Sequence, residues 1–186
     1  MKKVVFLLIL LLLTVYCFGC NASPIVKTYW TQNPDGTFHT NDVNRLQQKI
    51  PFKIIVPTFF PEGLSSGLLN IYGPSPVTSG SGIKGIELQI SYQQTGKRLF
   101  ITEDNLGEVL NPNPDLNPKY YDIRGINILR QKPRYSNDLG QSLWFDWTLN
   151  GISYGVKVYS ISEDDGLKIV ESIIIQKNTG ANSTSL

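Results

Sequence analysis

Residues 143–159 read LWFDWTLNGISYGVKVY, with the dipeptide Asn150-Gly151 in the middle of this apolar-rich stretch. A type I′ turn needs positive φ at both of its central positions, and Asn-Gly is the strongest short-range signal for it. The stretch therefore predicts a β-hairpin whose two strands flank this dipeptide. Trp147 and Tyr154 are expected to face each other across the hairpin. An antiparallel sheet built around it is the expected centre of the fold.

Further segments alternate apolar and polar residues or are rich in β-branched ones, which is typical of strands. These expected strands lie at 53–56, 68–72, 86–92, 99–101 and 120–129. The residues 73–85 are rich in Gly, Ser and Pro and predict a flexible loop instead. The sequence thus favours an antiparallel sheet of about six or seven strands.

Apolar residues at helical spacing predict one helix near each end of the sheet. Val43, Leu46 and Ile50 follow an expected N-cap at Asn41 and form one stripe. A capping-box pattern, Ser160-x-x-Glu163, precedes the apolar stripe of a closing helix. The predicted fold class is α+β: a single domain with a short N-terminal helix and a C-terminal helix.

The first twenty residues have the features of an export signal. Lys2 and Lys3 precede ten apolar residues at 4–13, which is too short for the ~20 residues of a spanning helix. Gly19 before Cys20, at the end of the apolar run, resembles the bacterial lipobox. The resemblance implies cleavage before Cys20 and attachment of diacylglycerol to its thiol. The alternatives are an uncleaved signal anchor and ordinary secretion.

These observations divide the chain into four expected parts. They are a lipoprotein signal peptide at 1–19, a tether at 20–40, a globular α+β domain at 41–176 and a flexible tail at 177–186. Removal of the signal takes two of the 17 basic residues and leaves 15, against 15 acidic residues. A neutral chain lacks the basic excess typical of nucleic-acid binders. With Cys20 lipidated there is no free thiol for a disulfide or a metal site, and no cofactor is expected.

Several short motifs imitate functional sites but lack the structural context that the chemistry needs. The dinucleotide-like motif at 80–85 precedes a strand pattern rather than a helix. The nucleophile-elbow pattern at 63–67 has no histidine downstream, because His39 lies upstream. The calcium-like spacing at 111–122 lacks the glycine of a calcium loop. The acidic residues at 163–165 are explained by their place in the first turn of a helix.

Three stretches together resemble a bacterial family of extracytoplasmic domains of unknown function. Members occur on secreted lipoproteins and on the outer side of membrane-bound anti-sigma-factor-like proteins. The stretches are IPFKIIVP at 50–57 with Pro61-Glu62-Gly63, the strand at 88–92, and Trp147-x-x-Asn150-Gly151-x-x-Tyr154 with the closing helix at 162–173. The resemblance implies a curved, half-barrel-like antiparallel sheet with helical cover. It implies no catalytic residues.

The expected function is that of a membrane-anchored lipoprotein on the extracytoplasmic side of a bacterial cell membrane, with a non-catalytic binding or scaffolding role. One alternative is a carrier or sensor that holds an acyl chain or peptide on the concave face of the sheet, and another is a hydrolase. Trp144, Trp147 and Tyr154 are the candidate ligand-binding residues. The expected partners are the membrane, through Cys20, and an envelope protein or apolar ligand. Because Trp144 and Trp147 are three apart on a strand, they are expected on opposite faces.

Overall fold

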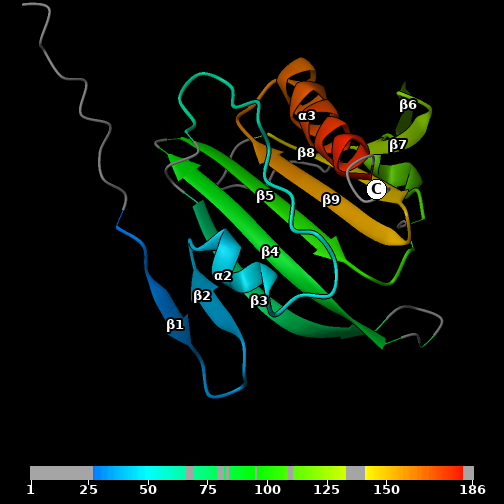
Figure 1. Cartoon of the computed structure of the whole chain (residues 1–186). Coiled ribbons are helices and arrows are strands. Elements are labelled where there is room, and N and C mark those ends of the chain that lie inside the picture. Colours follow the sequence, from blue (N-terminus) through cyan, green and yellow to red (C-terminus); the bar gives the residue numbers. More distant parts are fainter. Residues whose placement is uncertain are drawn as a thin grey trace, which may run out of the picture.

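The computed structural model describes residues 27–65, 69–78, 82, 84–94, 96–108, 111–132 and 141–181. These residues form one open antiparallel sheet of nine strands and two α-helices (Figure 1). The strand order is β1-β2-β3-β4-β5-β9-β8-β7-β6. The strands are β1 (Trp30–Gln32), β2 (Phe38–Thr40), β3 (Leu69–Thr78), β4 (Lys84–Gln94), β5 (Lys97–Asp104), β6 (Lys119–Ile123), β7 (Ile126–Gln131), β8 (Ser142–Leu149) and β9 (Ile152–Tyr159), and the helices are α2 (Val43–Gln47) and α3 (Glu163–Ala181).

The central hairpin is confirmed. Asn150 and Gly151 have φ values of 53° and 73°, as a type I′ turn requires, and they join β8 to β9. Trp147 pairs with Tyr154 in the register, and their rings stack with centroids 5.2 Å apart. The expected antiparallel sheet with helices is therefore present, but the number of six or seven strands was wrong.

Some of the additional strands come from segments that were expected to be irregular. The stretch expected as a tether, 20–40, contains β1 and β2, so the sheet begins before the expected domain boundary at 41. β3 continues to Thr78, inside the expected loop at 73–85. The expected strand at 53–56 is wrong: this segment has no regular structure, and the Ile55 amide donates to a carboxylate oxygen of Glu103 instead of to a neighbouring strand.

The strand expected at 120–129 is a second tight hairpin. Arg124 and Gly125 both have positive φ, 57° and 79°, and connect β6 to β7. An arginine with positive φ is uncommon, so the first of the two turn positions carries only a weak turn signal in the sequence. One long strand therefore becomes two strands at the edge of the sheet.

The helix caps differ from the expected ones by one or two residues. The N-cap of α2 is Asp42 rather than Asn41, and its side chain accepts a hydrogen bond from the Arg45 amide at 2.9 Å. At α3 the Ser162 hydroxyl accepts from the Asp165 amide at 3.1 Å, whereas Ser160 lies outside the helix with a φ of 56°. The helix also extends to Ala181, beyond the expected start of the tail at 177.

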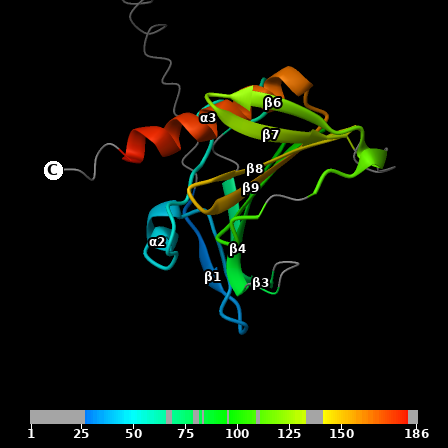
Figure 2. The same ribbon diagram turned by 90° about the vertical axis from the view of Figure 1, so that its right-hand side faces the viewer.

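Both helices lie on the same side of the bent sheet, and the apolar core lies between them and the sheet (Figure 2). Alternation along β8 directs Phe145 and Trp147 into this core. At Gly166 of α3 the helix approaches Phe145 so closely that an added Cβ would lie 2.7 Å from the ring. The glycine that weakens the helix pattern is thus required by packing.

Replacement of Gly166 by alanine is expected to destabilise the protein, although alanine favours a helix by about 1 kcal/mol over glycine. Overpacking of a core contact costs about 1–3 kcal/mol, and here the added methyl group meets a ring that is fully buried. Urea unfolding measures the effect. In a Phe145→Leu background the same change should be neutral or stabilising; equal destabilisation in both backgrounds would contradict the packing explanation.

Candidate functional site: a split between two strands on the open face

The face of the sheet opposite α2 and α3 is called the open face here. Residues that alternate with the core positions point toward it, so Val156 and Val158 lie in the core while Lys157 lies on the open face. Polar and aromatic side chains predominate there. On the five strands β5 to β9, the residues of the open face include Phe100, Thr102, Tyr120, Asn127, Leu129, Gln131, Trp144, Asp146, Thr148, Ser153, Lys157 and Tyr159.

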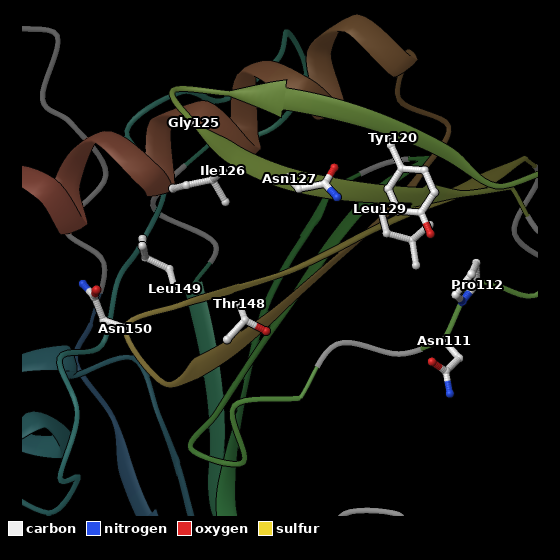
Figure 3. A pocket seen from close by; sticks show the side chains of 10 residues that line it. All are labelled: Asn111, Pro112, Tyr120, Gly125, Ile126, Asn127, Leu129, Thr148, Leu149 and Asn150. Carbon is white, nitrogen blue, oxygen red and sulfur yellow. The ribbon is translucent and has the colours of Figure 1, made fainter.

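Strands β7 and β8 are paired over only part of their length. Their ladder consists of three pairs: Leu129 with Asp146, Arg130 with Phe145, and Gln131 with Trp144. The first three residues of β7 and the last three of β8 are therefore not paired with one another. Figure 3 shows the two strands diverging toward the turns at Gly125 and Asn150. This divergence is called the split.

The hairpin register shows which main-chain groups of β7 face the split. In a hairpin closed by a two-residue turn, the flanking residues form a hydrogen-bonded pair, and such pairs then alternate along the ladder. Ile123 and Ile126 flank the β6–β7 turn, so Ile126 bonds to β6. It follows that Asn127 and Leu129 direct their N–H and C=O groups the other way, toward β8.

The same alternation applies to β8. Leu149 and Ile152 flank the turn to β9, so Thr148 and Asp146 direct their main-chain groups toward β7. Asp146 meets Leu129 in the ladder. The next hydrogen-bonded pair of the ladder would join Thr148 to Asn127, and it is not formed. The main-chain donors and acceptors of these two residues thus face the split without a ladder partner among the described strands.

A depression of about 580 Å³ lies at the split (Figure 3). Its lining carries no charged side chain. Three asparagines from three different segments surround it, together with Tyr120 and aliphatic side chains. The lining residues are Asn111, Pro112, Tyr120, Gly125, Ile126, Asn127, Leu129, Thr148, Leu149 and Asn150. A volume of this size is in the range of sites that bind small ligands, roughly 300–1,000 Å³.

The connection between β5 and β6 forms one rim of this depression and is fixed to β7. The Asn113 amide donates to the Gln131 side-chain oxygen at 3.0 Å, and the Lys132 amide donates to the Leu116 carbonyl at 2.7 Å. These bonds position Asn111 and Pro112 beside the split.

A second, smaller depression of about 210 Å³ lies farther along the open face, over β5 and β9. It is lined in part by Phe100, Thr102, Lys157 and Tyr159. The Lys157 ammonium lies 4.8 Å from the centre of the Trp144 ring, a cation–π contact on the neighbouring strand. Aromatic and hydrogen-bonding groups therefore extend along the open face from β7 to β5.

A buried carboxylate lies on this face between the two depressions. Asp146 is 8% exposed, and burial raises its pKa to about 6, while a hydrogen bond from Gln131 and the charge of Lys157 act in the opposite direction. Within the described part of the chain, its Oδ2 atom and the hydroxyl oxygens of Thr148 and Ser153 are buried without a hydrogen-bond partner. Such groups are costly to bury, and they gather at functional sites more often than elsewhere.

The structure separates the three residues predicted from the sequence to bind a ligand. Trp147 and Tyr154 stack on each other in the core, only 1% and 2% exposed, so neither ring offers surface to a ligand. Trp144 lies on the open face, as expected from the spacing of the two tryptophans. Sequence reasoning missed the split, because its signal was the Arg124-Gly125 turn that divides the expected strand at 120–129.

The other sequence motifs have structural roles where the structure describes them. Glu163 accepts hydrogen bonds from Tyr121 and from the buried Arg130, with the Arg130 Nη2 to Glu163 Oε2 distance at 3.1 Å. His39 stacks on Tyr72 with centroids 4.2 Å apart. Across the ranges that the structure describes, no group of three His, Cys, Asp or Glu side chains is placed to hold a metal ion. Parts of the motifs at 63–67 and 80–85 lie outside those ranges.

Comparison with known proteins gives no match, whether to a protein-family model, to a curated protein or to a solved structure. Among the described helices, none has the length and apolar character needed to cross a membrane. Cys20 and the apolar run before it lie outside the described residues. The lipid anchor and the family resemblance therefore stay predictions.

Proposed function

We propose that this protein is a lipid-anchored bacterial protein that holds a ligand on the open face of its sheet, at the outer side of a cell membrane, without catalysing a reaction on it. The observation that supports binding is the uncharged depression at the split between β7 and β8. In this proposal the curved sheet is half-barrel-like. The hairpin of β6 and β7 at its end forms one wall of the binding site.

The anchor is supported by the sequence around Cys20. Each buried methylene contributes roughly 0.8 kcal/mol, so two or three acyl chains hold a protein on a bilayer almost permanently. The first strand starts at Trp30, ten residues after Cys20, and an extended chain of that length spans at most about 35 Å. In this proposal the domain stays close to the membrane and its open face meets ligands of the envelope.

The non-catalytic role is supported by the lining of the larger depression. General acid–base catalysis needs a group that exchanges protons near the working pH, such as histidine or a carboxylate with a raised pKa. The residues that line the depression include neither, and Asp146, which pairs with the lining residue Leu129, is not among them. The site is suited to hold a ligand by hydrogen bonds and apolar contact.

Replacement of Cys20 by alanine tests the anchor. The wild-type protein, labelled in cells with a fatty-acid analogue, is expected to incorporate the label, and Cys20→Ala is expected to lose it and to leave the membrane fraction. Cys17→Ala is the matched control and should keep both label and location. Labelling of Cys20→Ala at the wild-type level would contradict a lipid on this residue.

A further inference from the structure

The split presents main-chain groups that an added extended chain would pair with. Asn127 on β7 and Thr148 on β8 each direct one N–H and one C=O toward it, and the register between the strands stops at Leu129 and Asp146, two residues from each of them. Free strand edges of this kind are the sites at which extended peptides add to a sheet. Here two such edges face each other across one depression.

We propose that the split binds an extended, uncharged peptide segment, whose main chain bonds to those of Asn127 and Thr148. This inference rests on the proposed binding role of the open face and names its ligand class. The unpaired part of β8, Trp147–Leu149, is three residues long, so the inserted segment spans about 10 Å. It runs antiparallel to one strand and parallel to the other, and both ladders are allowed.

The chemistry of the lining determines which side chains the segment carries. A charged side chain would lose its hydration beside aliphatic groups without gaining a counter-ion, because all ten lining residues are uncharged. Apolar side chains of the peptide would pack against Leu129 and Leu149. The carboxamides of Asn111 and Asn150 each offer donors and an acceptor to the remaining peptide groups.

The surface between these residues also favours a peptide over a saccharide. A sugar commonly stacks its C–H face on an aromatic ring in its binding site. Tyr120 is the one aromatic residue in this lining, and it is 57% exposed at the rim. The main-chain N–H and C=O groups of Asn127 and Thr148, in contrast, are of the kind that pair with a peptide main chain in a β-ladder.

A competition between defined probes tests the ligand class. The full-length protein, extracted from membranes in detergent and immobilised, is incubated with three sets of probes. They are capped pentapeptides with Ala, Val, Ser or Thr at the three central positions, the same peptides with Lys or Glu there, and chitotetraose. Mass spectrometry measures what is retained. At least tenfold greater retention of uncharged peptides over charged ones is expected.

Two variants of one residue separate main-chain pairing from side-chain contact. Thr148→Pro removes the N–H that faces the split and leaves the β8–β9 ladder intact, whereas Thr148→Val keeps that N–H and loses only the hydroxyl group. Thr148→Pro is expected to weaken peptide retention about tenfold, the effect of one hydrogen bond. Thr148→Val should retain peptides like the wild type. If Thr148→Pro does not fold, Asn127→Pro removes the facing donor on β7.

The outcomes are distinguishable from those of the anchor experiment. Retention of charged and uncharged peptides alike, retention of no peptide, or full binding by folded Thr148→Pro and Asn127→Pro would overturn the inference. Retention of chitotetraose alone would also overturn it, while supporting a binding role for the open face. Loss of the lipid label would remove the proposed anchor and leave the peptide result unchanged, because the probes bind the detergent-extracted protein.

Discussion

Asparagine in place of Asp146 is expected to stabilise the folded protein at pH 7 by up to about 3 kcal/mol. Burial raises the pKa of this carboxyl from 3.8 to about 6, and each pKa unit corresponds to about 1.4 kcal/mol. The folded state therefore favours the protonated form. Well below pH 4 the carboxyl is protonated in both states and its ionisation does not affect the free energy of unfolding. As the pH rises from about 4 to 6, ionisation lowers this free energy, and the loss reaches its full size above that range.

Urea unfolding of both proteins between pH 4 and pH 8 measures this effect. The two stabilities should be similar at pH 4 and separate as the pH rises, with the variant more stable. Glu62→Gln, which removes an exposed carboxylate, is the matched control for the loss of one negative charge. A constant difference between wild type and Asp146→Asn across the pH range would contradict a raised pKa. Confirmation would mean that the open face keeps a carboxylate that reduces stability, as functional sites often do.

Removal of the Glu163 carboxylate is expected to destabilise the protein by about 3 kcal/mol at pH 7. Its partner Arg130 is 2% exposed, and a buried cation left without its counter-ion costs roughly 3–5 kcal/mol. The lower end of this range applies, because Glu163 is partly exposed and Arg130 keeps its bond to the Asn117 carbonyl. Glu163→Ala also removes the contact with Tyr121 that joins β6 to the first turn of α3.

The matched control is Asp164→Ala, the exposed acidic neighbour in the same helical turn, which should change stability by less than about 0.5 kcal/mol. Burial alone would raise the pKa of Glu163, but the Tyr121 hydroxyl and the Arg130 charge outweigh it and hold the pKa below its usual value. The stabilisation is therefore present at neutral pH and lost as the pH falls through this lowered pKa. Equal effects of the two alanine variants, measured by urea unfolding, would show that only the helix dipole matters.

The sequence predicted those parts of the fold whose signals are local. Asn150-Gly151 specifies a turn by its backbone preference, and the alternation at 86–92 specifies a half-buried strand, now β4. The segment Lys53–Val56 also has a strand-like, β-branched composition, but it pairs with no strand. Its Ile55 amide donates instead to the carboxylate of Glu103, a residue far along the chain. Composition alone does not distinguish these cases, since a strand exists only when a neighbour pairs with it.

The candidate site also combines features that local sequence signals predict with features that depend on distant parts of the chain. The sequence by itself determined the hairpin of β8 and β9, the antiparallel character of the sheet and the opposite faces of Trp144 and Trp147, because turn preference and side-chain alternation act within a few residues. Only the tertiary structure decided that Trp147 and Tyr154 are both buried in the core and that β7 pairs with β8 only from Leu129 onward. Where strands separate depends on the register of two hairpins and on the bend of the whole sheet, and no short stretch of residues contains that information.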